Sequence, residues 1–173
     1  MNDTLFSPHF SERELTESAT AKRLGIDNTP PPQVKENLLR LCLYTLEPLR
    51  LALDLPIIIT SGYRCKALNY AILSHSSNSQ HMTGMAADFY VGWSAPLNGR
   101  GRNGGELSPR ERLIKAFRLI LSCDSIEYDQ LILYPSFIHV SFVSHQANRH
   151  HVMVAHGNGR YRGVSRETAL TIS

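Results

Sequence analysis

The feature that most restricts the fold of this chain is a pair of apolar segments, 128–134 and 137–143, separated only by Pro135-Ser136. Both segments are rich in residues that favour strands, and a two-residue break between such runs is typical of a β-hairpin. Two other short β-prone runs, 55–60 and 86–91, predict further strands, and we expect the first to lie in the centre of the sheet. The chain is therefore predicted to build a small, mostly antiparallel sheet.

Helical patterns fill much of the remaining sequence. Ser11 and Glu14 have the spacing of a capping box, and Ser108 and Glu111 repeat it, with Pro109 at the first helical position. Elsewhere, apolar residues recur at helical spacing. The predicted helices are one from Ser11 towards Gly25, a long amphipathic one over 34–49, a short one over 66–73 and one from Ser108 to about Cys123. Helices packed on a small sheet define an α+β fold.

Two stretches lack these patterns. Residues 92–107 hold several glycines among Arg and Asn and predict a flexible Gly-rich loop, because the Gly-Lys-Ser/Thr of a phosphate-binding loop is absent. Residues 145–173 form a C-terminal tail in which 152–154 predict one more edge strand. No repeat or linker divides the chain, so we expect a single domain over 1–173.

Composition excludes some classes of function. The net charge of +3 is too small to predict nucleic-acid binding, although it is compatible with an anionic polymer such as a bacterial cell wall. The N-terminus lacks the features of a secretory signal, and no apolar stretch approaches the roughly 20 residues that span a bilayer. We expect a monomer made in the cytoplasm, with free and mainly buried thiols at Cys42, Cys65 and Cys123.

The eight histidines divide into two groups. His81 begins a run of small residues that ends in Asp88 at the head of a strand, and His139 interrupts an apolar strand. The other six lie in polar or loop-like sequence, where a solvated position is the default. His150 and His151 are adjacent, and adjacent side chains of a strand point to opposite faces, so they cannot both reach one ion. The six are His9, His75, His145, His150, His151 and His156.

His81, Asp88 and His139 are predicted to bind one zinc ion. The small residues between His81 and Asp88 let the backbone pack tightly and aim both side chains at one point. Taken singly, each residue has an ordinary structural explanation: a loop histidine, an aspartate at an N-cap, and a core histidine bonded to a carbonyl. Two histidines and one carboxylate together suit zinc, and they leave the fourth tetrahedral position for water, as in catalytic sites.

The same residues carry a resemblance to a known family. The pattern Ser-x-His-x-x-Gly-x-Ala-x-Asp over 79–88, followed about fifty residues later by His139, resembles the zinc D-alanyl-D-alanine carboxypeptidases and related phage endolysins. Their fold is shared with the hedgehog signalling domain. Supporting segments similar to the small phage and prophage branch are 18–21, 26–28, 61–64 with Asn69, and 128–132.

The resemblance implies a hedgehog-like α+β fold and zinc ligation by His81, Asp88 and His139. It places Arg64 where the tetrahedral oxyanion is stabilised, and Ser79 near the substrate. The chemistry is coherent, because zinc lowers the pKa of bound water to about 7 and polarises the scissile carbonyl. A guanidinium aimed at the oxyanion adds a few kcal/mol of stabilisation.

The general base of these peptidases has no obvious counterpart. It is usually a Glu or Asp three residues before the last ligand, and that position is Ser136 in this chain. A two-residue hairpin turn pairs Ile132 with His139, so that Gln130 shares the face of His139 and Asp129 points to the other face. Asp129 is therefore a poor candidate unless a bulge shifts the register.

Three explanations stay open at this point. A carboxylate such as Glu106 could fold in from the Gly-rich segment, or Gln130 or Tyr134 could orient the water that the metal activates. Alternatively, the chain is a zinc-stabilised module that binds a cell wall or a protein without catalysis. We expect hydrolysis of peptidoglycan stem peptides, as a carboxypeptidase or endopeptidase, with Ser79 and Gln130 in contact with the substrate. A phage origin would explain how a chain without a signal acts at the cell wall or in the periplasm.

Overall fold

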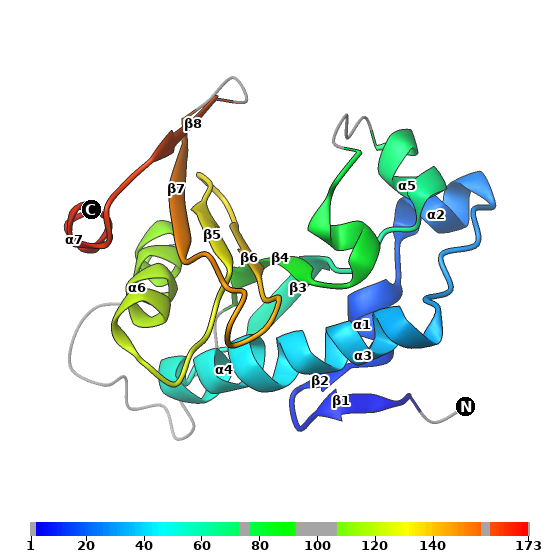
Figure 1. Cartoon of the computed structure of the whole chain (residues 1–173), viewed down its shortest axis with the longest axis horizontal. Helices are drawn as coiled ribbons and strands as arrows, with labels where there is room; N and C mark the ends of the chain where they lie inside the picture. Colours follow the sequence, from blue (N-terminus) through cyan, green and yellow to red (C-terminus); the bar gives the residue numbers. More distant parts are fainter. Residues whose placement is uncertain (1–2, 73–76, 93–106, 157–159, 173) are drawn as a thin grey trace.

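The computed structural model describes residues 3–72, 77–92, 107–156 and 160–172 (Figure 1). The predicted Gly-rich segment lies outside this part of the chain except for its two end residues, Gly92 and Leu107. The described residues form a mixture of helices and strands, which confirms the α+β class. Among the described helices, none combines the length and apolar character that crossing a bilayer requires.

Six strands form the main sheet in the order β3-β4-β6-β5-β7-β8. Neighbouring strands are antiparallel except for β5 and β7, so the prediction of a mostly antiparallel sheet is confirmed. A short antiparallel pair, β1 and β2, lies near the N-terminus. The bounds are β1 Leu5–Ser7, β2 Phe10–Ser11, β3 Ile57–Ser61, β4 Ala86–Val91, β5 Gln130–Leu133, β6 Ile138–Ser141, β7 His151–His156 and β8 Arg160–Gly163.

Two strand positions differ from the sequence predictions. The run 55–60 is predicted to be central, but β3 lies at one edge of the sheet. The tail segment 152–154 is predicted to be an edge strand, but β7 lies between β5 and β8. β-branched composition indicates a preference for extended backbone and not a place in the sheet. The true outer neighbour, β8, is exposed at every position and therefore shows no apolar alternation.

The hairpin formed by β5 and β6 has the predicted register. Ile132 pairs with His139, and the N–H of Tyr134 donates to the carbonyl of Phe137 at 3.0 Å to close the turn. At the other end the ladder is irregular, because the N–H of Gln130 donates to the side-chain hydroxyl of Ser141 at 3.0 Å. The residue before Gln130 therefore does not follow the regular alternation of the strand.

Side-chain alternation divides the sheet into an apolar face and an open face. Phe89, Leu131 and Val140 are fully buried in the main core together with leucines from the helices, and α6 packs against β4 and β5. Residues in between, such as Asp88 and His139, point to the opposite face. Figure 1 shows α4 and α6 along one side of the sheet, whereas α2 and α5 lie on the other side of the molecule. The open face is left as the floor of a site.

Seven α-helices occur in the described part of the chain. Both predicted capping boxes are present, with Ser11 and Ser108 as N-caps. The single helix predicted from Ser11 towards Gly25 is wrong: the chain turns extended at Glu17, and Ser18 caps a second helix by accepting the N–H of Ala21. The bounds are α1 Glu12–Thr16, α2 Ala19–Leu24, α3 Pro32–Leu41, α4 Glu47–Leu53, α5 Lys66–Ala71, α6 Pro109–Ser122 and α7 Arg166–Leu170.

The long predicted helix over 34–49 is a run of three helical pieces. Between α3 and α4 lies a π-helical turn, η1 (Cys42–Leu46). Pro48 lies in the first turn of α4 and has no N–H to donate, so regular α-helical bonding cannot continue through it. The fully buried Thr45 in η1 donates its hydroxyl to the carbonyl of Glu127 at 2.5 Å, which ties this helix to the segment that leads into β5.

Candidate metal centre

Three predicted ligands meet on the open face of the sheet. Asp88 in β4 and His139 in β6 are directly paired across two neighbouring strands. His81 comes from η2 (Gln80–Thr83), a 3₁₀ turn just before β4. The Nδ1 atom of His139 lies 2.7 Å from Oδ1 of Asp88, and the Nε2 atom of His81 lies 3.3 Å from the same oxygen. The two ring nitrogens are 3.2 Å apart.

The separations of 3.2 and 3.3 Å match the spacing of ligands around a small metal ion, whereas the 2.7 Å between His139 and Asp88 is that of a direct hydrogen bond. Nitrogen and oxygen ligands at about 2.0–2.1 Å in a tetrahedron lie about 3.3 Å from one another. All three residues are largely buried, and each offers one donor atom to a common point. Among the described residues, this is the one group of three or more His, Cys, Asp or Glu side chains close enough to hold a metal ion.

The ring of His81 is oriented by the backbone of Gly62. Its Nδ1 atom lies 2.8 Å from the Gly62 carbonyl oxygen, so Nδ1 carries the proton and donates it in a hydrogen bond. The unprotonated Nε2 atom is then free to coordinate a metal ion. A Cβ atom on Gly62 would lie 2.2 Å from the carbonyl oxygen of Leu15 in α1. That oxygen accepts the N–H of Tyr63 at 2.7 Å. Only glycine fits this contact between β3 and α1, and the contact fixes the carbonyl that holds His81.

A second glycine sets the path from His81 to Asp88. Gly84 ends η2 in the left-handed region, with φ of +72°. A Cβ atom there would lie 2.7 Å from the carbonyl oxygen of Val34 in α3. The sharp turn and the close approach to α3 explain why the segment between these two ligands is rich in small residues.

The protonation states also suit a metal ion. Burial alone would raise the pKa of Asp88, but the two neighbouring histidines outweigh it and hold that pKa below its usual range. Burial lowers the pKa of His81, against the opposing charge of Asp88. An ionised carboxylate and a neutral imidazole are the forms that coordinate metals.

Arg64 lies beside the cluster with a buried donor that has no partner. Its backbone N–H donates to the carbonyl of His81 at 3.2 Å. Its side-chain Nε atom is buried and makes no hydrogen bond within the described part of the chain. Burial lowers the pKa of Arg64, while the negative charge of Asp88 raises it. A buried guanidinium N–H without a partner in the described part of the chain, beside a cluster that could hold a metal ion, is a donor that a substrate oxygen would satisfy.

Asn28 anchors the segment that carries Arg64. Its Nδ2 atom donates to the carbonyls of Thr16, at 2.8 Å, and Tyr63, at 3.1 Å. Its Oδ1 atom accepts the N–H of Cys65 at 2.7 Å. Asn28 thus bonds the residues on both sides of Arg64. Apart from the family resemblance, no pattern in the sequence marks this role, because the partners are distant along the chain.

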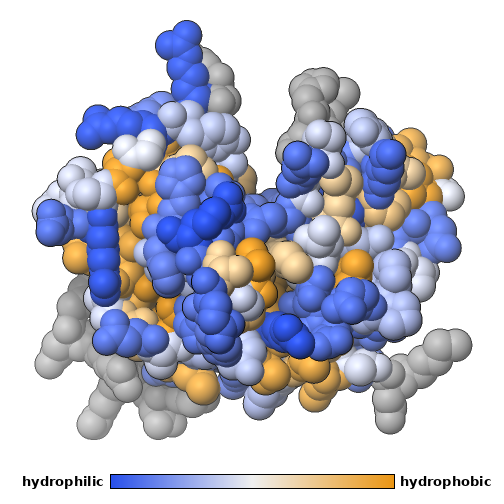
Figure 2. All heavy atoms as spheres, in the orientation of Figure 1, coloured by the Kyte–Doolittle hydropathy of each residue, from blue (hydrophilic) through white to orange (hydrophobic). Residues whose placement is uncertain are grey.

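The cluster opens into a cavity of about 740 Å³. Figure 2 shows the surface hollowed between the β7–β8 side and the α5 side of the molecule. Arg64, Ser79 and Gln130, predicted to act on substrate, all line this cavity together with the three ligands. The other lining residues, most of which the sequence did not single out, are Asn78, Gln80, Ile132, Tyr134, Phe137, Arg149, Met153 and Tyr161.

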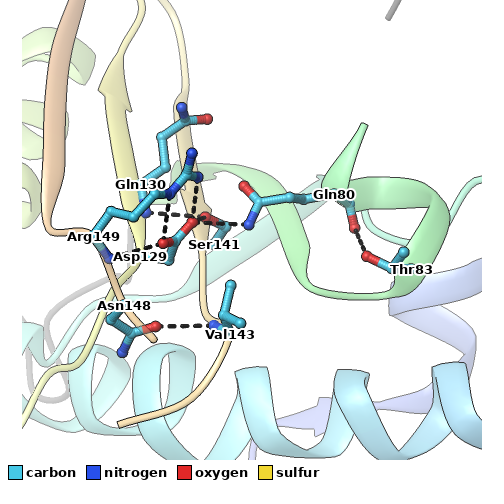
Figure 3. A network of polar contacts seen from close by, with 8 residues as sticks. All are labelled: Gln80, Thr83, Asp129, Gln130, Ser141, Val143, Asn148 and Arg149. Atoms are coloured by element: carbon cyan, nitrogen blue, oxygen red, sulfur yellow. Dashed lines mark hydrogen bonds and ion pairs between the residues drawn. The ribbon is translucent and has the colours of Figure 1, made fainter. Parts of the chain in front are cut away.

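Asp129 anchors one wall of this cavity from behind (Figure 3). It is fully buried, and its carboxylate accepts hydrogen bonds from Gln80 at 2.8 Å and Ser141 at 3.3 Å. Arg149 adds three bonds, from its backbone N–H and Nε at 2.9 Å and from Nη2 at 2.5 Å. Burial alone would raise the pKa of Asp129, but the bonds to Arg149 and Gln80 hold it below its usual range. The carboxylate therefore links the turn of His81 to the strand of His139.

The described residues offer no second carboxylate in the cavity wall. Asp88 is the single acidic residue among the lining residues that the structure describes. Ser136 is exposed in the hairpin turn, and Glu106 lies outside the described residues. Asp129 was expected on the face opposite His139, but it precedes β5 and its carboxylate reaches Gln80 and Ser141. Because its carboxylate already accepts five hydrogen bonds, Asp129 is not free to act as a general base.

The remaining histidines lie away from this cluster. His9 contacts the carboxylate of Glu47 at 2.6 Å, and His145 contacts that of Glu127 at 2.5 Å. His150 packs edge-on against Tyr128, and His151 and His156 are exposed on β7. His75 lies outside the described residues. The cysteines are free as predicted, although only Cys42 is buried and the other two are half-buried.

Comparison with known proteins points to one family. The family model described as Peptidase M15 matches residues 8–96, slightly more than half of the chain. The match includes Arg64, His81 and Asp88, and it ends before His139, which the structure places beside them. No curated protein matches the chain.

Proposed function

We propose that this chain, which belongs to the M15 peptidases, uses one zinc ion to hydrolyse peptide bonds in peptidoglycan stem peptides. M15 peptidases are zinc-dependent metallopeptidases. The observation that carries the proposal is the geometry of His81, Asp88 and His139, whose donor atoms lie 2.7 to 3.3 Å apart beside an unpartnered guanidinium N–H.

The donor set fits zinc on chemical grounds. Two imidazole nitrogens and one carboxylate oxygen are the ligands that zinc takes in hydrolases, and three protein ligands leave one position open. The carbonyl of Gly62 orients His81 in the way that outer partners orient metal-bound histidines. When bound, zinc would supply Lewis-acid polarisation of the scissile carbonyl and an activated water.

Arg64 would stabilise the charge that develops on the carbonyl oxygen. Its backbone is bonded to His81, so the guanidinium is held at a fixed place beside the ligands. Its buried Nε–H has no partner among the described residues, so a substrate oxygen that enters the site would give it one. A donor that finds its partner only in the complex contributes most when that oxygen becomes negative.

The cavity suits a polar peptide with carboxylate groups. Two guanidinium groups, those of Arg64 and Arg149, lie in its wall, and the single described carboxylate there is a metal ligand. Stem peptides carry carboxylates along their length and at their end. Ser79 and Gln130 line the cavity and are proposed to bind the peptide backbone through their polar side chains. We further propose that the protein meets this substrate at the cell wall or in the periplasm, after release by a phage.

A non-catalytic module is the second candidate function. The observation in its favour is that the described cavity wall contains no carboxylate other than the ligand Asp88. In this reading zinc stabilises the fold, and the cavity binds a cell-wall peptide without cleaving it. The two candidates differ in turnover and not in metal binding.

Zinc-loaded protein and purified sacculi provide the test. The peptidase proposal expects new amino and carboxyl groups to be released, with the activity lost in chelator and restored by zinc. The matched variant Arg64→Lys keeps the charge but loses the planar donor fork, so turnover should fall roughly 100-fold with zinc content unchanged. Zinc-replete protein that binds sacculi and releases no product would refute the peptidase proposal and support the module.

A further inference from the structure

Two tyrosine hydroxyls face the cavity as a bonded pair. Tyr134 follows directly after β5, Tyr161 lies in β8, and both line the cavity of the metal cluster. The hydroxyl of Tyr134 donates to the hydroxyl oxygen of Tyr161 at 2.9 Å. Ala155 of β7 pairs with Tyr161, and its neighbour Val154 pairs with Leu133, so the small Ala155 lies between the two tyrosines. This arrangement lets the two rings meet above the open face of the sheet.

Four contacts hold Tyr134 in place. Its ring stacks on Phe137, with centroids 4.1 Å apart and planes 14° from parallel. Its N–H donates to the carbonyl of Phe137 at 3.0 Å, and its carbonyl accepts Nη1 of Arg110 at 2.9 Å. With Tyr161 holding the hydroxyl, both ends of the side chain are fixed. A pre-positioned donor costs little reorganisation when a substrate binds.

The hydroxyl of Tyr134 lies within the field of the metal site. Burial, the bond to Tyr161 and the charge of Asp88 raise the pKa of Tyr134, and Arg64 opposes them. The hydroxyl is therefore a proton donor and not a base at neutral pH. The pair has two hydroxyl protons and one mutual hydrogen bond, so one O–H is left for a third partner. Rotation of the hydroxyls decides which tyrosine offers it.

We infer that Tyr134, supported by Tyr161, is a further catalytic residue. It donates a hydrogen bond to the oxygen of the scissile carbonyl while the carbonyl carbon becomes tetrahedral and the oxygen gains negative charge. This inference rests on the proposed peptidase function. No proton is transferred: the O–H bond of Tyr134 stays intact, and Tyr161 turns its own proton towards the Tyr134 oxygen. Arg64 and Tyr134, which both line the cavity, then stabilise the same developing charge.

Three conservative variants test this role. Tyr134→Phe removes the hydroxyl and keeps the ring that stacks on Phe137, and Tyr161→Phe removes the supporting bond. Tyr90→Phe is the matched control, because Tyr90 is exposed on β4 and is not part of the cavity wall. We expect kcat for a stem peptide to fall roughly 100-fold in Tyr134→Phe and on the order of 10-fold in Tyr161→Phe, with KM nearly unchanged.

Binding of a phosphinate analogue of the cleaved peptide gives a readout besides activity. Its tetrahedral oxygens mimic the developing charge, so its affinity should fall with kcat in Tyr134→Phe, while the affinity for product and the zinc per chain stay at the values of Tyr90→Phe. Unchanged kcat and phosphinate affinity in Tyr134→Phe, or a loss of zinc in that variant, would overturn the inference alone. A wild-type protein that is zinc-replete and inactive would overturn the proposed function as well.

Discussion

Replacing Asp129 with Asn is the sharpest test of how the candidate metal cluster is held in place. Asp129 is fully buried and accepts five hydrogen bonds, three of them from Arg149. The substitution keeps the shape but removes the charge, and it turns one acceptor into an N–H₂ donor that faces other donors. Breaking a buried ion pair by removing one partner costs about 3–5 kcal/mol. Because the side chain of Arg149 is 56% exposed, water can rehydrate it, and we expect a loss of about 2–3 kcal/mol.

The substitution should also weaken zinc binding, because Gln80 precedes His81 and donates a hydrogen bond to Asp129. Chemical denaturation of the zinc-free protein, followed by circular dichroism, measures the free energy of unfolding, and a competition titration measures zinc affinity. Asp124→Asn is the matched control, because the side chain of Asp124 is fully exposed and its change should stay within about 0.5 kcal/mol. Equal stability and equal zinc affinity in the two variants would refute the role assigned to Asp129.

Asp129 should also make the stability of the fold depend on pH. The folded pKa of Asp129 is held below its usual value by Arg149 and Gln80. Its contribution to stability is therefore fully present above roughly pH 5 and is lost as pH falls through the folded pKa. In Asp129→Asn the stability curve on the acid side should be flatter than in the wild type. Parallel curves would contradict the assignment.

Three further substitutions have distinct expected outcomes. In Gly62→Ala the new Cβ atom would lie 2.2 Å from the carbonyl oxygen of Leu15, so the backbone must shift, and we expect a loss of about 1–3 kcal/mol in denaturation together with weaker zinc binding in a competition titration. Asn28→Ala removes three bonds around the segment of Arg64, and we expect kcat in a peptidase assay to fall roughly 10-fold or more with zinc content unchanged. His81→Ala should reduce the zinc per chain, measured by elemental analysis, from one to near zero, because two ligands remain.

Matched changes elsewhere separate these effects from general damage. Gly163→Ala adds a Cβ atom whose nearest neighbour is 3.9 Å away, and it should be neutral where Gly62→Ala is not. Ser122→Ala removes one exposed bond, to the carbonyl of Arg118, and should leave kcat unchanged. His156→Ala removes an exposed histidine of β7 and should keep full zinc content. Effects of equal size in these controls would contradict the specific roles assigned above.

Local patterns were enough to predict the elements that carry the ligands. The hairpin turn at Pro135-Ser136 fixed the pairing of Ile132 with His139, and the structure shows that pairing. The small residues before Asp88 predicted tight backbone packing, which the structure shows where Gly84 approaches Val34 of α3. Both are properties of neighbouring residues, and for that reason a single sequence reveals them.

Contacts between distant segments had no such signal. Three such contacts join residues from separate segments of the chain. They are the hydrogen bond that His81 donates to the Gly62 carbonyl, the ion pair of Asp129 with Arg149, and the approach of Tyr161 to the cavity. The order of strands was also beyond local pattern, because the composition of β3 and β7 does not indicate that β3 lies at an edge and β7 inside the sheet. Packing of the helices on one face decides which contacts form, and that is a property of the whole fold.

The most direct test of the central claim is a titration of peptidase activity against zinc. Metal-free protein is given increasing zinc, and the release of amino groups from a purified stem peptide is followed at each ratio. We expect the activity to rise linearly, to saturate at one zinc per chain, and to be absent at every ratio in His139→Ala. Activity without zinc, or no activity at any zinc ratio in the wild type, would contradict the claim that His81, Asp88 and His139 form the centre of a zinc peptidase.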